Sequence, residues 1–592
     1  MEAGPLSIKK IFSQDRRHLV PLFQRPYVWD KERQWEPLWE DIRVVADRLA
    51  CAADVKPHFL GAIVLDQVLQ ATGKIETRLV VDGQQRLTTL QIMLEAFCDL
   101  CSAEGLDKHH KALLKLTRND DPMSEDPDED FKVWPTNQDR EAFRQVMRCE
   151  SAADLRKMYG SKPAGHPIAD AYLYFYAEMQ QWLALKTEGA EDRLEALLNT
   201  MRDYIRLVVI DLDKDDDAQL IFETLNARGT QLLPSDLVKN LLFHRAQRAK
   251  KAIEPLYANY WKPFDDEAPY WREEIGRGHA QRARIDLFLQ YYLTAQIKDE
   301  VPVSHLYVMF RDFVQSNGDP EDVLRSVRHY AKVYRSFWDF EEASKEQVFF
   351  ARLDAQDVTT AYPFLLELFA NGTGREEILK VLGDVESFLV RRMICQLNTR
   401  GYNRLFTELL KRLGNGVGPV SERVREYLLS SDADSVRWPK DDEFKTAWMT
   451  SPLFRALAQK RVRLVLAAIE QRLRTGKTES MPLTGKLTIE HILPQDWQKH
   501  WPLQARQEGA EDPLERRERL IHSLANLTLL TGSLNPSVSN GPWESKRQQI
   551  KEHSLLRLNN DLCKHEVWNE DCIEDRGRQL FDLARAIWTY PG

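Results

Sequence analysis

The chain has 592 residues, of which 43% are hydrophobic and 29% are charged, and its formal net charge is −9. A single hydrophobic core rarely grows beyond roughly 250–300 residues, so this length predicts several domains. The negative net charge excludes a general attraction to nucleic acid. Any such contact has to come from local basic surface, as at Arg516, Arg517 and Arg519.

The apolar stretches are too short to cross a membrane. The longest, such as residues 59–65 and 464–469, fall well below the roughly 20 apolar residues that span a bilayer. The first residues show no basic segment followed by an apolar one, so we expect no secretory signal. Seven cysteines over this length do not predict a disulfide framework, which agrees with a reducing compartment. We therefore expect a cytoplasmic protein without a membrane partner.

The first predicted region, residues 1–245, mixes strands with helices. Residues 58–65, 78–81 and 206–212 are predicted strands because they are short, apolar and rich in β-branched side chains. The acidic, proline-containing stretch at residues 120–130 has the composition of a surface insertion.

Three polar motifs lie in this region: Phe-Gln-Arg-Pro-Tyr-Val-Trp at residues 23–29, Asp-Gly-Gln-Gln-Arg-Leu-Thr-Thr-Leu at 82–90, and Phe-Glu-Thr-Leu-Asn-Ala-Arg-Gly at 222–229. The second motif follows a predicted strand and begins a predicted helix. Free backbone N–H groups and the helix dipole favour an anion such as phosphate at that position.

The side chains of the second motif extend this prediction. Arg86, together with Arg25 of the first motif, could hold phosphate oxygens through bidentate hydrogen bonds. Asp82 could bind Mg²⁺, and Gln84 or Gln85 could orient a water molecule. On chemistry alone, a capped turn with surface arginines explains the same residues.

The second region, residues 246–420, is predicted to be helical. In residues 323–338, for example, the apolar side chains fall on one stripe of a helix. A glycine-rich break at residues 414–419 ends the region. Its residues say little about function, and we interpret it as a connector.

The third region, residues 421–592, carries a second chemical motif. A strand-like run, Leu-Thr-Ile, leads into Glu490 and His491, and Asn526 and Asn535 follow with eight residues between them. Hydrolysis of a phosphodiester needs a base and a hard cation. His491 suits the base, while Glu490 and Asn535 offer oxygen ligands for Mg²⁺. Adjacent strand residues point to opposite faces, so Glu490 and His491 share one site only if the strand bends there.

This order of residues resembles the ββα-metal (His-Me finger, HNH) nucleases. The resemblance implies that His491 is the general base, Asn526 braces the loop that orients it, and Glu490 and Asn535 bind Mg²⁺ or Mn²⁺. The family usually has Asp or His in the place of Glu490. Lys546 is expected to contact DNA phosphate.

The three N-terminal motifs resemble the DGQQR-motif domain of the GmrSD-type, type IV restriction enzymes. Those enzymes fuse a ParB/sulfiredoxin-like domain to a His-Me finger nuclease, so the resemblance implies an α+β, multi-domain chain. It also implies binding and hydrolysis of a nucleoside triphosphate (GTP, ATP or CTP) with Mg²⁺. The implied nucleotide site comprises Gln24, Arg25, Asp82, Gly83, Gln84, Gln85, Arg86, Thr88 and Asn226, with Asp82, Gln84 and Gln85 taking part in hydrolysis.

The resemblance further implies cleavage of modified, double-stranded phage DNA, and it allows a homodimer. Related members sense phosphorothioate DNA through the first motif, so Gln24 and Tyr27 have an expected second role, Tyr27 as a DNA contact. Two alternatives stay open. One is a ParB-like, nucleotide-switched DNA-binding protein with an inactive nuclease end, and the other is an RNase toxin that uses the same metal centre.

Overall fold

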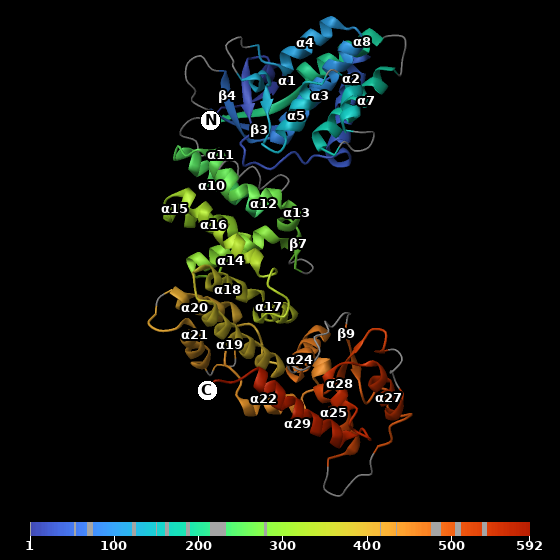
Figure 1. The fold of residues 1–592 in the computed structure, drawn as a ribbon. Coiled ribbons are helices and arrows are strands. Elements are labelled where there is room, and N and C mark those ends of the chain that lie inside the picture. Colours follow the sequence, from blue (N-terminus) through green and yellow to red (C-terminus); the bar gives the residue numbers. More distant parts are fainter. Residues whose placement is uncertain are drawn as a thin grey trace. The chain divides into compact units, whose positions relative to one another are not determined.

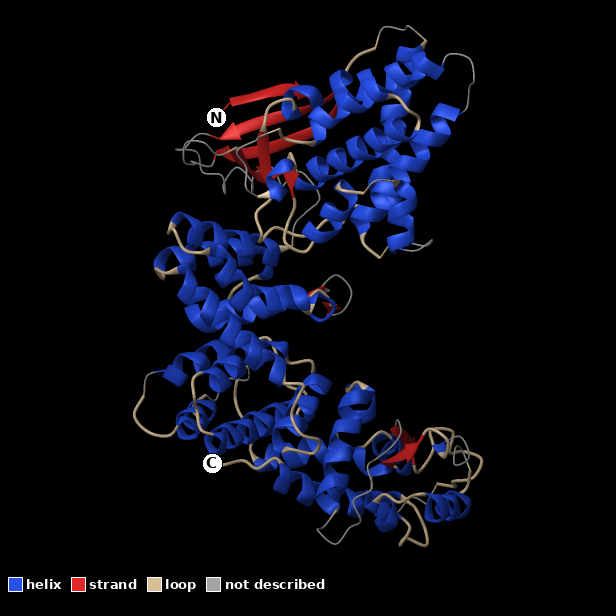
Figure 2. Cartoon of the chain, turned by 45° about the horizontal axis from the view of Figure 1, so that its top comes forward, coloured by secondary structure: helices blue, strands red, loops and turns tan. Residues whose placement is uncertain are grey.

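A computed structural model describes residues 2–51, 55–67, 75–120, 126–149, 151–159, 165–184, 190–212, 233–276, 281–414, 416–431, 433, 435–474, 487–503, 511–535 and 541–592. These residues are mostly helical and include a mixed sheet, as an α+β, multi-domain chain requires (Figures 1 and 2). Among them, no helix has the length and apolar character needed to cross a membrane.

The chain divides into two compact units, residues 1–273 with 310–324, and residues 274–309 with 325–592. The division crosses two helices, α15 (Leu306–Ser316) and α16 (Pro320–Ser336). The three predicted regions, with boundaries at 245 and 420, stay a prediction.

The first unit is built on a six-stranded sheet in the order β1-β6-β3-β4-β2-β5. β3 pairs antiparallel with β4 and parallel with β6, so the three predicted strands lie together at the centre. The predicted strands are confirmed as β3, β4 and β6. The strands are β1 (Glu2–Ser7), β2 (Arg16–Leu19), β3 (His58–Gln67), β4 (Glu76–Asp82), β5 (Val133–Trp134) and β6 (Ile205–Leu212).

Helices cover this sheet, and the apolar side chains of both layers form one core (Figure 1). The helices of the first unit before α15 are α1 (Ile8–Phe12), α2 (Glu36–Ala50), α3 (Gln84–Ala103), α4 (Asp107–Thr117), α5 (Arg140–Met147), α6 (Ala152–Tyr159), α7 (Pro167–Ala184), α8 (Ala190–Asn199), α10 (Pro234–Arg248), α11 (Ile253–Leu256), α12 (Lys262–Asp266) and α13 (Ala268–Trp271).

The chain passes from β4 to α3 through Gly83, whose φ is +90°. A Cβ at this position would lie 2.4 Å from Ile63 Cγ2, so only glycine fits. α3 is buried around most of its circumference, because it packs against helices as well as strands. The tight turn therefore brings the polar start of α3 directly to the end of β4.

The second unit is a helical assembly with two small two-stranded sheets, β7–β8 and β9–β10 (Figure 2). The predicted break at 414–419 is confirmed, since α20 ends at Gly414 and α21 begins at Val420. The elements of this unit are β7 (Glu274–Ile275), β8 (Arg282–Ala283), α14 (Arg284–Ile297), α17 (Lys345–Gln356), α18 (Tyr362–Ala370), α19 (Arg375–Ile394), α20 (Tyr402–Gly414), α21 (Val420–Leu429), α22 (Asp441–Thr450), α23 (Leu453–Ala456), α24 (Gln459–Leu473), β9 (Leu487–His491), α25 (Pro513–Ile521), β10 (Leu527–Thr531), α27 (Trp543–His553), α28 (Arg557–Leu562) and α29 (Glu570–Ile587).

Candidate active sites in the two units

The first two N-terminal motifs lie against each other at the start of α3. The Gln85 amide accepts a hydrogen bond from the Val28 backbone N–H at 2.9 Å and donates one to the Pro26 carbonyl at 3.1 Å. Gln84 donates to the Arg25 carbonyl at 3.2 Å. The two glutamines thus hold the loop of the first motif on the second.

Gln24 and Tyr27 point into the protein. Gln24 Nε2 donates to the Val80 carbonyl at 2.6 Å, at the end of β4. The Tyr27 hydroxyl lies 2.7 Å from Thr89 Oγ1 and accepts from Trp35 Nε1 at 2.9 Å. Only 4% of Tyr27 is exposed, and burial raises the pKa of its hydroxyl. The geometry supports a positioning role for Tyr27 rather than the predicted contact with DNA.

The predicted nucleotide ligands differ in their accessibility. Gln24, Gln85 and Thr88 are buried, whereas Arg25, Asp82, Gln84 and Arg86 are partly exposed. Asn226 and the third motif lie outside the described residues.

Arg25 lies in a charged cluster next to α10. Burial lowers the pKa of Arg25, and the negative charges of Asp236 and Asp82 oppose this shift. Asp236 also accepts a hydrogen bond from Arg272 Nη2 at 2.9 Å. The Phe23 ring stacks on Phe243 of α10, with centroids 5.5 Å apart. The helix that follows the third motif is therefore packed against the first motif.

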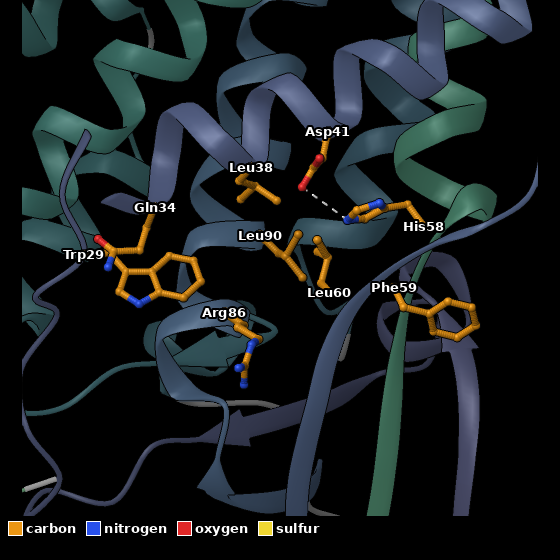
Figure 3. A pocket seen from close by; sticks show the side chains of 9 residues that line it. All are labelled: Trp29, Gln34, Leu38, Asp41, His58, Phe59, Leu60, Arg86 and Leu90. Carbon is orange, nitrogen blue, oxygen red and sulfur yellow. Dashed lines mark ion pairs between the residues drawn. The ribbon is translucent and has the colours of Figure 1, made fainter. Parts of the chain in front are cut away.

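Arg86 lines a cavity of about 260 Å³ (Figure 3). Its Nη1 donates to the Ala62 carbonyl at 3.0 Å, and its guanidinium lies over Gly61, where a Cβ would be 3.4 Å away. Trp29 of the first motif lines the same cavity, as does His58, whose Nε2 is 3.4 Å from Asp41 Oδ2. The cavity thus combines an arginine, an aromatic ring and a polar pair. Its lining is Trp29, Gln34, Leu38, Asp41, His58, Phe59, Leu60, Arg86 and Leu90.

In the second unit, β9 and β10 form an antiparallel pair in which His491 lies opposite Leu527. Asn526, fully buried, precedes β10. Its Oδ1 accepts from the Leu493 N–H at 2.9 Å, and its Nδ2 donates to the Leu493 carbonyl at 2.8 Å. The Asn526 side chain therefore holds the loop immediately after His491, which is the arrangement that a brace needs.

Glu490 is paired with Lys546 of α27. Lys546 Nζ lies 2.7 Å from Glu490 Oε1 and 2.7 Å from the His491 carbonyl oxygen. Burial raises the pKa of Glu490 and lowers that of Lys546, while the charge of each opposes the shift of the other. Only 1% of Lys546 is exposed, so in this structure it is bound to Glu490 and is not accessible for the predicted phosphate contact.

The candidate metal ligands share one face of β9, and the candidate base lies on the other. Asn535 Nδ2 donates to Thr488 Oγ1 at 2.8 Å. Thr488 and Glu490 are two residues apart in a strand, so their side chains point to the same face. His491 points to the opposite face, as strand alternation requires. The structure does not bring all four predicted residues into one centre.

His491 instead lies against two residues that the motif did not predict. Its ring packs edge-on against Phe454, with centroids 4.4 Å apart, and lies 5.6 Å from the His522 ring. Burial, followed by His522, Lys546 and Arg455, lowers the pKa of His491 to about 4. His491 Nε2 and His522 Nδ1 are buried without a hydrogen-bond partner among the described residues. The sequence signal for His522 is its position four residues before Asn526.

Whether Glu490 and Asn535 can hold Mg²⁺ or Mn²⁺ depends on the position of Lys546. Glu490 and Asn535 carry the oxygen donors that such ions prefer. However, a divalent cation at Glu490 would meet the buried Lys546 ammonium on the same carboxylate. Within the described residues, no group of three or more His, Cys, Asp or Glu side chains could hold a metal. The residues therefore fit the ion only with Lys546 displaced from Glu490.

The predicted basic surface near residue 517 is largely neutralised. Arg516 and Arg519 contact Glu574 at 2.8 and 3.3 Å, and buried Arg517 contacts Glu570 at 2.5 Å. The acidic residues of α29 that lie opposite these arginines offset much of the expected positive charge.

Two family models match the chain. The GmrSD restriction endonuclease, N-terminal domain, matches residues 8–243, and the GmrSD restriction endonucleases, C-terminal domain, matches residues 438–583. A comparison with curated proteins gave no match. The two matches follow in the family's order, cover most of the chain and include both candidate sites. The chain therefore belongs to the GmrSD restriction endonucleases, whose substrate is DNA.

Proposed function

We propose that this chain cleaves modified, double-stranded phage DNA, with His491 as the base that takes a proton from water. The observation that carries the proposal is the orphan Nε2 of His491 at the end of a strand clamped by Lys546 and Asn526. Burial lowers the pKa of His491 to about 4, so the ring is neutral at neutral pH, which is the form that a general base requires. The order β9, β10 and α27 supports an HNH-type (ββα-metal) centre.

Mg²⁺ or Mn²⁺ would be held by Glu490 and Asn535, and would stabilise negative charge on the phosphate and the leaving oxygen. Because His491 lies on the other face of β9, the end of this strand would have to bend for the base and the ion to act on one phosphate. Asn526 keeps the loop after His491 in place. Lys546 holds the His491 carbonyl and screens Glu490 until the ion is present.

A nucleoside triphosphate (GTP, ATP or CTP) is proposed to bind at the start of α3 and to regulate cleavage. Arg86 and Arg25 would hold its phosphates, together with the first-turn N–H groups, which have no intrahelical partners. Asp82 and Gln84 are accessible for hydrolysis, whereas Gln85 positions the loop. The sheet and helices of this unit are compatible with a ParB-like domain, and a homodimer would allow nucleotide to control release of DNA.

The nuclease proposal is tested by incubating purified protein and Mg²⁺ with plasmid, base-modified phage DNA and RNA. We expect cleavage of modified DNA by the wild type and by Val417→Ala, a substitution at a fully exposed position. His491→Ala should lose cleavage and keep nucleotide hydrolysis. Cleavage of RNA alone would favour the RNase alternative, and DNA binding without cleavage would favour the nucleotide-switched binding protein.

The nucleotide proposal is tested by calorimetric titration of GTP, ATP and CTP into wild-type protein and Arg86→Ala. Loss of two charge-assisted hydrogen bonds should weaken binding at least tenfold, because each contributes about 1.5–3 kcal/mol. The matched control is Arg33→Ala, because the Arg33 side chain is 81% exposed and lies outside the cavity. If all three proteins bound nucleotide with equal affinity, the motif at residues 82–90 would be only a capped turn with surface arginines.

A further inference from the structure

The helical part of the second unit contains a cleft of about 1010 Å³. One face of α14 lines it, through Arg284, Leu287, Gln290, Tyr291 and Thr294, which recur at helical spacing. Ligand sites in proteins usually occupy roughly 300–1,000 Å³, so the cleft could hold a nucleotide with substituents. None of the predicted site residues lies in it.

Aromatic rings form one wall of the cleft. Tyr362 stacks on Tyr291 at 5.4 Å between centroids and on Trp338 at 6.2 Å, with interplanar angles of 12° and 16°. Trp338 remains 49% exposed, and the Arg284 guanidinium lies 5.7 Å from its ring centroid. Trp338 is therefore an exposed aromatic ring held in place by its neighbours, and a further planar ring can stack on it.

The charged groups of the cleft balance each other. Arg282, Arg284 and Lys460 are matched by Glu300, Asp354 and Asp357, and Lys460 is ion-paired with Asp357. A strongly basic groove would be expected for a phosphate backbone. A balanced cleft with amide and hydroxyl groups fits a neutral planar ring with hydrogen-bonding edges, which describes a nucleobase.

One short segment joins this cleft to the candidate nuclease site. Phe454 of α23 packs on His491, and Lys460 of α24, six residues later, lines the cleft. Six residues span at most about 22 Å, which corresponds to roughly six base pairs of duplex. A base held in the cleft and a phosphate at His491 can therefore belong to one DNA molecule.

We propose that this cleft binds a nucleobase extruded from the DNA substrate, stacked on the exposed Trp338 ring. The proposal rests on the proposed function as a DNA endonuclease. Enzymes that inspect a base commonly extrude it into a pocket and stack it on aromatic side chains. The aromatic wall supplies binding to any base, and the polar groups of α14 and Lys460 would read its edge.

The experiment compares binding of two labelled duplexes by fluorescence anisotropy in EDTA, which keeps DNA intact. One duplex is fully paired and the other carries a single extrahelical base. We expect the full-length wild type to prefer the extrahelical base. Trp338→Ala should reduce this preference roughly tenfold, since stacking of one base contributes on this scale. Leu287→Trp should also reduce it by filling the cleft, and Trp338→Phe should retain most of it.

The matched control is Tyr427→Ala. Tyr427 forms the same type of pair with a guanidinium, that of Arg412 at 4.0 Å, in the same unit but outside the cleft. A duplex with extrahelical 5-iodouracil should photocrosslink to Trp338, Tyr362 or Tyr291. Adducts only elsewhere, or an unchanged preference in Trp338→Ala, would overturn the cleft assignment. If the wild type binds neither duplex and cleaves no DNA, the proposed function itself fails.

Discussion

Lys546 Nζ lies 2.7 Å from Glu490 Oε1 and at the same distance from the carbonyl oxygen of His491. One buried ammonium therefore holds both the side chain of the candidate metal ligand and the backbone of the candidate base. The ammonium therefore places one positive charge beside the Glu490 carboxylate. It explains how the Glu490 side chain can be only 14% exposed, since an unpaired carboxylate there would be costly.

Lys546→Met should make folding stability depend on Mg²⁺. In EDTA the variant should lose about 3–5 kcal/mol, because the Glu490 charge stays buried without its partner. Mg²⁺ should then raise its Tm more than that of the wild type, since the ion no longer competes with the ammonium. Lys564→Met, which removes an exposed ion pair, is the matched control. If Mg²⁺ raised the Tm of all three proteins equally, Glu490 would not be a ligand of the ion.

Asn526→Asp and Asn535→Ala should affect cleavage differently. The first removes the donor to the Leu493 and Ile521 carbonyls, so the loop after His491 loosens. We expect a rate up to about 100-fold lower at an unchanged Mg²⁺ requirement, since small misplacements of a catalytic group have effects of this size. The second should shift cleavage to higher Mg²⁺ because an oxygen ligand is lost. Cleavage rates measured across a Mg²⁺ titration separate the two effects. The reverse pattern would make Asn526 the metal ligand and Asn535 the residue that braces the loop.

Gly83→Ala should destabilise the first unit more than Gly105→Ala. Both positions have positive φ, +90° and +71°, so alanine strains the backbone in both. Only at Gly83 would the Cβ meet another side chain, at 2.4 Å from Ile63, whereas the space at Gly105 is open. The difference should be about 1–3 kcal/mol, the typical effect of overpacking. Urea midpoints of the first unfolding transition provide the measurement, and equal midpoints would contradict the steric argument.

Gln85→Glu should be more harmful to stability than Gln84→Glu. The buried Gln85 amide donates to the Pro26 carbonyl, and a carboxylate there would lose the donor and face the carbonyl oxygen. The expected loss is about 1–3 kcal/mol. Gln84 is partly exposed, so its variant should lie within about 1 kcal/mol of the wild type. Thermal denaturation tests this order. A larger loss of stability in Gln84→Glu than in Gln85→Glu would show that Gln84, not Gln85, is the glutamine that holds the loop.

His18 should make the first unit sensitive to acid. This residue of β2 is 1% exposed, and burial, followed by Arg16, Lys132 and Arg78, lowers its pKa from the usual 6.5 to about 4. Between pH 6.5 and 4 the unfolded chain binds the proton more readily, so stability falls as the pH falls through this window.

The loss at pH 4 amounts to about 3 kcal/mol at 1.36 kcal/mol per pH unit. His18→Phe cannot titrate, so its stability relative to the wild type should rise as the pH is lowered from 6.5 to 4. Free energies of unfolding at several pH values measure the difference. A constant difference would show that His18 does not carry the effect.

The sequence alone determined the local elements and the order of the motifs. The β-branched runs predicted β3, β4 and β6, and the Asp-Gly step predicted the turn into α3, because hydrophobic spacing and backbone freedom are properties of a few neighbouring residues. The spacing of His491, Asn526 and Asn535 likewise singled out the strand pair that carries the candidate nuclease site.

Only the tertiary structure decided which polar side chains face solvent and which face each other. Tyr27, Gln85 and Lys546 are buried on protein partners, and His522 lies beside His491 although no motif connects them. The cleft around Trp338 assembles from helices far apart in the chain. The physical reason is that the role of a polar group depends on its burial and on the charges near it in space. Both are set by residues far apart in the chain, so no regular spacing in the sequence predicts them.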